Sequence, residues 1–64
     1  MIKNKIKTLR ESKGITQEDL ANALKVSRQT IIAMEKGNYE PSLGLAIKVA
    51  RFFDMSVEKI FITN

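Results

Sequence analysis

The sequence predicts an all-α domain of five short helices. Apolar residues recur every three or four positions along most of the chain, which is the spacing of one helix face. A hydroxyl residue stands just before four of the periodic segments, where its oxygen can cap the first turn: Thr16, Ser27, Ser42 and Ser56. Glycine or proline separates several of the segments, so each helix is expected to be short.

The first helix is expected over residues 2–12. Ile2, Ile6 and Leu9 lie at positions i, i+4 and i+7 of this segment, so they share one helix face. Gly14 follows two residues after the segment and suits the left-handed backbone that closes a helix. The segment therefore has an apolar face for the core and a marked end.

The second and third helices are expected over residues 17–24 and 28–36. Thr16 precedes the second helix, and Asp19 lies three residues later, at the spacing of a capping box. Ser27 precedes the third helix, and a glycine follows that helix directly. Two short capped helices joined by a tight break are typical of a pair that crosses at a steep angle.

The fourth helix is expected over residues 43–53 and the fifth over residues 57–61. Pro41 is disfavoured inside a helix and suits the position before a cap at Ser42. Ser56 would cap the fifth helix. The last three residues are too few to assign. Their β-branched pair could extend as a strand and pair across a dimer, although fraying is the expected state.

Composition limits the chain to one small domain and excludes several classes of function. There are 64 residues, 44% of them apolar, with neither cysteine nor histidine. This excludes a disulfide framework, a Cys or His metal site, and catalysis by a thiol or imidazole, and no cofactor is expected. No apolar run approaches the ~18 residues that span a bilayer, and the basic N-terminus is not a secretory signal. These features fit a cytoplasmic protein.

The chain is basic, which favours polyanionic partners. Lysine and arginine number 11 against 7 acidic residues, for a net charge of +4 and a pI near 9.7. A positive field attracts nucleic acid and speeds the encounter with it. Charge alone does not separate this function from an ordinary solvated surface.

A longer pattern covers residues 16–37: Thr16-Gln17-x-x-Leu20-Ala21-x-x-Leu24-x-Val26-Ser27-x-Gln29-Thr30-Ile31-x-x-Met34-Glu35-Lys36-Gly37. It closely resembles the helix-turn-helix of the phage repressor-like (Cro and Xre type) regulators. The resemblance extends over nearly the whole chain and implies a compact, five-helix, lambda-repressor-like DNA-binding domain. It also implies a minimal member of the family that consists of this single domain, residues 1–64.

In such a domain the start of the third helix reaches base edges in the major groove. Gln29 can pair bidentately with adenine, and Arg28 with guanine. Ala33, one turn after Gln29, could touch a thymine methyl, and so could Ile32 on the same side. The residues expected to contact bases are Ser27, Arg28, Gln29, Ile32 and Ala33.

Phosphate contacts are expected from a different set of residues. Gln17 begins the second helix, where unpaired backbone N–H groups and the helix dipole favour an anion. The resemblance likewise implies a role for this glutamine in anchoring the DNA backbone. The full set expected at phosphates is Gln17, Thr30, Lys36, Asn38 and Tyr39. The alternative for each is a solvated surface residue.

The resemblance implies a structural role for two charged residues, and this sequence departs from the family pattern at one position. Family members often hold an arginine and a glutamate at the positions of Arg10 and Glu35 in a partly buried salt bridge. A catalytic role for Glu35 is a poor fit, because no acid, base or nucleophile is expected beside it. Lys25 stands where the family usually has glycine. A left-handed backbone there would cost on the order of 1 kcal/mol relative to glycine.

A homodimer is also expected, with its surface within residues 45–64. A helical wheel of the fourth helix predicts that one set of residues faces the core: Leu43, Ala46, Ile47, Ala50 and Phe53. Val49 lies at the edge of this face. The apolar residues expected in an exposed dimer patch are Leu45, Val49, Phe52, Phe61 and Ile62. The alternative is a wide core stripe under the tail. A two-fold dimer would place its recognition helices roughly 34 Å apart and select a palindromic operator.

Together these features predict a sequence-specific, double-stranded-DNA-binding transcriptional regulator with no catalytic activity. Repression by blocking a promoter is the expected outcome. Two alternatives remain open. One is the DNA-binding antitoxin of a toxin–antitoxin pair, which would have a protein partner. The other is a protein-interaction module that does not bind DNA, which the polar residues at 27–30 argue against.

Overall fold

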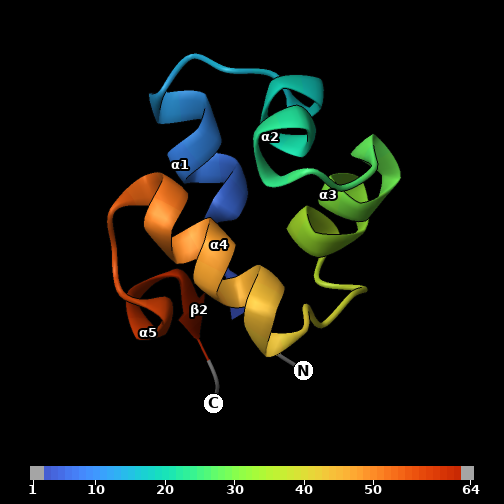
Figure 1. Ribbon diagram of the computed structural model, residues 1–64. Helices are drawn as coiled ribbons and strands as arrows, with labels where there is room; N and C mark the ends of the chain where they lie inside the picture. Colours follow the sequence, from blue (N-terminus) through green and yellow to red (C-terminus); the bar gives the residue numbers. More distant parts are fainter. Residues whose placement is uncertain (1–2, 63–64) are drawn as a thin grey trace.

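The computed structural model describes residues 3–62 (Figure 1). Its elements are, in chain order, β1 (Lys3–Asn4), α1 (Ile6–Ser12), α2 (Gln17–Leu24), α3 (Arg28–Lys36), α4 (Leu43–Phe53), α5 (Val57–Ile60) and β2 (Phe61–Ile62). The five helices confirm the predicted fold class. Apart from the start of α1, their bounds differ from the predicted ones by one residue at most. Within residues 3–62, no helix is long and apolar enough to cross a membrane.

The predicted caps form at the starts of α2, α3 and α4. At α2 the capping box is complete: the Thr16 hydroxyl accepts the Asp19 N–H at 3.0 Å, and the Asp19 carboxylate accepts the Thr16 N–H at 3.0 Å. These hydrogen bonds lower the pKa of Asp19. Ser27 and Ser42 each accept one backbone N–H of the following turn. Ser56 occupies the corresponding position before α5 but makes no side-chain cap.

Two helices end on a left-handed residue that is not glycine. Lys25 closes α2 with φ at 60°, so this position keeps a left-handed backbone although lysine replaces the glycine usual in similar proteins, and Asp54 closes α4 with φ at 54°. Glycine occupies the equivalent position after α3, where Gly37 has φ at 79°. No pattern in the sequence indicated the conformation of Asp54, although aspartate tolerates it better than most residues.

The start of α1 corrects the prediction that a helix runs from residue 2. Lys3 and Asn4 form β1, which pairs antiparallel with β2 in the register Lys3↔Ile62 and Asn4↔Phe61. The Asn4 side-chain oxygen accepts the N–H of Ile6, so the helix begins there. Ile2, part of the predicted helix, lies outside the described residues.

The end of the chain is also corrected. Ile62, expected to fray or to pair across a dimer, instead pairs with β1 of the same chain. The backbone N–H of Lys5 donates to the carbonyl of Ile60 at 3.0 Å and extends this connection. The two ends of the described chain are therefore tied together. Residues 63 and 64 lie outside the described range.

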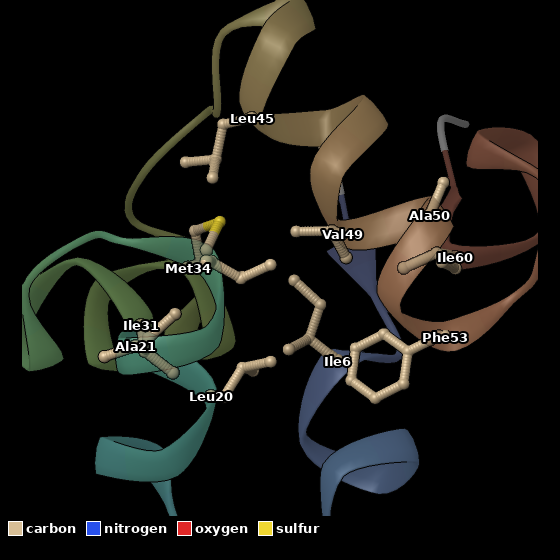
Figure 2. Close-up of a cluster of buried hydrophobic side chains, with 11 residues drawn as sticks. Ile6, Leu20, Ala21, Ile31, Met34, Leu45, Val49, Ala50, Phe53 and Ile60 are labelled. Carbon is tan, nitrogen blue, oxygen red and sulfur yellow. The ribbon is translucent and has the colours of Figure 1, made fainter.

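The core lies where the five helices meet (Figure 2). Its largest fully buried side chains come from all of them: Ile6, Leu20, Ile31, Met34, Val49 and Ile60. Fully burying one aliphatic side chain contributes about 1.5–3 kcal/mol. Ile31 and Met34 therefore fix one face of α3 against the rest of the domain and leave the other face outward.

The orientation of α4 differs from the predicted one. Its buried residues are Leu45, Ala46, Val49, Ala50 and Phe53. Leu43 and Ile47, expected in the core, are 74% and 39% exposed, whereas Val49 is fully buried. Apolar residues occur on nearly all sides of this helix, so periodicity alone does not select the face that is buried. Packing against α2 and α5 selects it.

Candidate nucleic-acid interface

The helices α2 and α3 are joined by a turn that the backbone fixes closely. The N–H of Lys25 donates to the carbonyl of Asn22, and the N–H of Val26 donates to the carbonyl of Ala21 at 3.0 Å. Leu24 is buried, and Val26 packs against the core beside it. These contacts set the crossing of the two helices and leave the first turn of α3 at the surface (Figure 1).

The first turn of α3 separates residues used for capping from residues that are free. The Ser27 hydroxyl accepts the Thr30 N–H at 3.1 Å and lies 2.9 Å from the Thr30 hydroxyl. Both side chains are therefore engaged with each other. Arg28 and Gln29, by contrast, are exposed. Of the residues predicted at base edges, these two extend most freely from the domain.

The remaining predicted base contacts lie on the same side of α3. At 3.6 residues per turn, Ile32 and Ala33 share a face with Arg28 and Gln29, opposite the buried side of the helix. Both are half-buried. Lys36, in the last turn, is exposed on this face as well. One continuous face of α3 thus carries polar residues at its start, small and apolar ones in the middle, and a cation at its end.

The predicted salt bridge is present behind this face. The Arg10 Nε donates to Glu35 Oε2 at 2.7 Å, with side-chain exposures of 11% and 4%. The Arg10 Nη1 also donates to the carbonyl of Ile15 at 2.9 Å. The hydrogen bond to Glu35 raises the pKa of Arg10 further above its usual value. The bridge connects α1, the loop before α2 and the end of α3.

Gln17 joins this cluster, which the sequence did not predict. Its Nε2 donates to Glu35 Oε1 at 3.1 Å, across 18 positions of sequence. The expected phosphate residue is therefore also a neighbour of the salt bridge, and its side chain is fixed at the start of α2. In the first turn of α2 the Thr16 hydroxyl accepts the Asp19 N–H, and the N–H groups before it have no partners within the helix, an arrangement that suits an anion. Short-range spacing could not have revealed this contact.

A shallow hollow brings the starts of α2 and α3 together. It is lined by Arg10, Gly14, Ile15, Thr16, Gln17, Glu18 and Arg28. Gln17 and Arg28, predicted at a phosphate and at a base, therefore border the same depression. Asn38 and Tyr39, the other predicted phosphate residues, are exposed in the segment after α3.

A second unpredicted contact holds the far end of α3. The Asn4 side-chain Nδ2 donates to the carbonyl of Met34 at 2.7 Å, across 30 positions of sequence. Because Asn4 also pairs with Phe61 in the two-stranded sheet, this bond connects the ends of the described chain to α3.

The residues predicted at a dimer surface are not gathered in one exposed patch. Val49 is fully buried and Leu45 is 9% exposed, so both belong to the core and the prediction was wrong for them. Phe52 and Phe61 are half-buried, and Phe52 packs edge-on against Phe53 with ring centroids 5.0 Å apart. Ile62 is 38% exposed.

The family comparison agrees with this geometry. The Helix-turn-helix family model matches residues 6–60. The chain belongs to this helix-turn-helix family. It is a transcriptional regulator with a helix-turn-helix DNA-binding domain. The family is non-enzymatic, which agrees with the structural role of Glu35 in the salt bridge to Arg10.

Relatives match this helix-turn-helix regulator over nearly its whole length. An uncharacterized HTH-type transcriptional regulator of Methanocaldococcus jannaschii is 61% identical over 61 residues, which are 95% of this chain and 92% of the relative. YgzD of Bacillus subtilis, an uncharacterized HTH-type transcriptional regulator, is 48% identical over 60 residues, 94% of this chain and 91% of that one. The cryptic phage CTXphi transcriptional repressor RstR of Vibrio cholerae is 33% identical over 60 residues, 94% of this chain and 54% of the relative.

A solved structure shares the arrangement of the helices. The crystal structure of a candidate DNA-binding protein from Bacteroides fragilis superimposes on the regulator with a TM-score of 0.83 at 27% identity. The match covers 97% of this chain and 100% of the other. The arrangement of the helices, α2 and α3 included, is thus one already seen in a solved structure.

Proposed function

We propose that this regulator represses transcription by binding an operator through the exposed face of α3. The observation that carries the proposal is the division of the first turn of α3. Ser27 and Thr30 hold each other in the cap, while Arg28 and Gln29 are free to reach a groove. In this arrangement Arg28 recognises a guanine, Gln29 recognises an adenine, and Ile32 and Ala33 contact thymine methyl groups.

Backbone contacts would place the helix in the groove. Gln17 binds a phosphate at the start of α2, and Lys36, Asn38 and Tyr39 bind phosphates at the far end of α3. Thr30 adds a contact by donating its hydroxyl hydrogen to a phosphate while it accepts the hydroxyl hydrogen of Ser27. Much of the affinity is electrostatic, because the chain has a net charge of +4.

The proposed operator is palindromic and the proposed regulator is a homodimer. Leu43 and Ile47 lie one turn apart on α4 and expose apolar side chains, and they replace Leu45 and Val49 in the proposed surface. Ile62, at the end of β2, is also exposed and apolar. Repression is supported by the 33% identical phage protein, which is named a transcriptional repressor.

Selection of duplexes from a randomised DNA pool at about physiological salt tests the proposal. The expected result is an enriched inverted repeat with half-sites one helical turn apart. A single enriched half-site would support DNA reading and reject the dimer. Binding without enrichment, lost as salt rises, would reject specific recognition and favour a protein-interaction module. Sedimentation of Ile47→Glu beside the unaltered protein tests the dimer surface independently, with the monomer expected for the variant.

A further inference from the structure

A second surface, away from the proposed DNA site, has a chemistry that DNA recognition does not require. A shallow groove lies between the end of α2 and the middle of α4, and its lining residues are Ala23, Leu24, Lys25, Lys48, Arg51 and Phe52. Leu24, which is buried, and Phe52, which is half-buried, form its apolar floor, and Ala23 is exposed beside them. The other three residues are basic and exposed. The groove is therefore apolar at its centre and cationic around it.

A fourth cation adds to this charge. The Lys13 Nζ lies 5.7 Å from the centroid of the Phe52 ring, within the range of a cation–π contact. No acidic residue of the described chain lines the groove. Among residues 3–62, the only salt bridge joins Arg10 to Glu35, so the cations of the groove have no carboxylate partner there. The lining of the groove itself is therefore cationic, and Arg51 also borders a neighbouring hollow that Asp54 and Glu58 line.

The groove and the hollow that Gln17 borders lie at opposite ends of α2, while Lys25 of the groove stands three residues before Arg28 of the proposed DNA site. Gln17, at the start of α2, borders the hollow beside α3, whereas Leu24 and Lys25, at its end, border the groove. The helix of eight residues separates them by about 12 Å. Lys48 and Arg51 stand on α4, which carries none of the proposed DNA contacts. Their charges are thus placed to meet something other than the operator.

We propose that this groove binds an acidic, amphipathic helical segment of a partner protein. The apolar floor accepts hydrophobic side chains spaced three and four residues apart, as in other helix-in-groove complexes. The surrounding lysines and arginine pair with glutamate or aspartate on the same segment and steer its approach. A second copy of this chain fits poorly, because a two-fold contact would set the cations of one groove against those of the other.

Selection from a displayed library of random 16-residue peptides on the immobilised protein identifies binders even though the partner is unidentified. The proposal expects enriched peptides that are acidic and carry apolar residues at helical spacing. A synthetic copy of an enriched peptide should shift the amide resonances of α2 and α4 around the groove in a titration. Enrichment without acidic bias, or shifts confined to α3, would overturn the proposal.

Substitutions then locate the contact. Lys48→Gln with Arg51→Gln should weaken the peptide roughly fivefold or more, since two ion pairs at the edge of the groove are lost. The control, Lys7→Gln with Lys59→Gln, changes exposed cations outside the groove and lowers the net charge equally, from +4 to +2 (4 − 2). Equal weakening by both pairs would overturn the proposal, because it would reduce the interaction to general charge attraction.

Ala23→Glu gives a second, independent variant. Ala23 is exposed on α2, so glutamate is tolerated in the helix while its length and charge obstruct the groove. Peptide binding should be lost and operator binding kept. If the Lys48 and Arg51 variant instead lost operator affinity with a smaller salt slope, the groove would be a phosphate surface. If it altered sedimentation, the groove would be a self-association surface. Either result would overturn the proposal.

Discussion

The two ends of α3 are held in opposite ways. At its C-terminal end, Asn4 binds the carbonyl of Met34, and Glu35 accepts hydrogen bonds from both Arg10 and Gln17. These contacts come from residues distant in the sequence and are partly buried. The N-terminal end is held by the local Ser27 cap, and its next two residues extend into solvent.

One end of α3 thus sets the orientation of the helix, and the other end carries the side chains proposed to recognise bases. Long-range contacts at one end of α3 fix its direction, so side chains at the other end need no partners within the protein to be correctly placed. Changes at the fixed end should therefore destabilise the whole domain, whereas changes at the free end should alter base preference and leave stability nearly unchanged.

Glu35→Ala should have the largest effect. It leaves the Arg10 guanidinium buried without its carboxylate, and breaking a buried ion pair from one side costs about 3–5 kcal/mol. Urea unfolding followed by circular dichroism measures the loss, with Glu58→Ala on the exposed side of α5 as control. Arg10→Met combined with Glu35→Leu should recover much of the stability. A loss below about 1 kcal/mol for Glu35→Ala would show that the bridge does not hold α3.

Asn4→Ala should have the next largest effect on stability. It removes the bond to the Met34 carbonyl and the bond to the Ile6 N–H, and unsatisfied partly buried groups cost about 1–3 kcal/mol. Thermal and urea unfolding measure the change. Asn22→Ala, on the exposed side of α2, is the matched control and should change stability by no more than about 0.5 kcal/mol. Indistinguishable unfolding curves for the two variants would show that the bond from Asn4 in β1 to α3 does not stabilise the domain.

Gln29→Ala tests the free end. It should leave the unfolding curve within about 0.5 kcal/mol of the original and reduce discrimination at one operator position by about 1–3 kcal/mol. Binding to operators varied one base pair at a time measures this preference. Lys36→Ala is the comparison: it should weaken all sequences similarly and lower the salt slope by about 1. If Gln29→Ala instead lowered the affinity for all operator sequences equally, Gln29 would be a contact to the DNA backbone rather than to a base.

Lys25→Gly should stabilise the domain at the junction just before the free end. Its left-handed backbone, with φ at 60°, costs lysine about 1 kcal/mol relative to glycine. Asp54→Gly, at φ of 54°, should gain less, because aspartate tolerates this conformation better. The urea midpoints of the two variants, each measured against the original protein, compare the two gains in stability. A stability loss for Lys25→Gly would mean that its side chain contributes more than the backbone strain costs.

The same division explains what could be predicted from the sequence. Caps depend on neighbours within a few positions, so the roles of Thr16 and Ser27 are predictable from local spacing. The left-handed ends are not: the family resemblance raised that conformation for Lys25, and nothing indicated it for Asp54. The bonds from Asn4 to Met34 and from Gln17 to Glu35 span 30 and 18 positions, and no local pattern indicates them. The Arg10–Glu35 bridge also spans 25 positions, and only the family resemblance made it predictable.

The buried face of α4 could not be predicted for another reason. Its sequence, LGLAIKVARFF, offers more apolar residues than one buried face can hold. Which of them are buried depends on the helices packed against it, so Leu43 and Val49 exchanged their expected places. The predicted dimer patch was affected because it was defined as the residues left over from that face.

Asp19→Asn should give the smallest effect, because it alters a local anchor of α2 and touches neither end of α3. The Asp19 carboxylate accepts the Thr16 N–H, and this bond holds the pKa of Asp19 below its ordinary value of 3.8. A carboxyl group with a lowered pKa in the folded state stabilises the fold fully above its unfolded pKa. That contribution is lost as the pH falls through the folded value.

The difference in unfolding free energy between the original protein and Asp19→Asn should therefore be constant above about pH 5 and shrink below pH 3.8. Urea unfolding at a series of pH values measures this difference. The control is Glu58→Gln, which removes one carboxylate from an exposed position of α5. If this free-energy difference persisted at low pH, asparagine at position 19 would destabilise the cap through its geometry rather than through the loss of the negative charge. Operator preference should be the same for both variants, because neither Asp19 nor Glu58 is among the residues that would read bases.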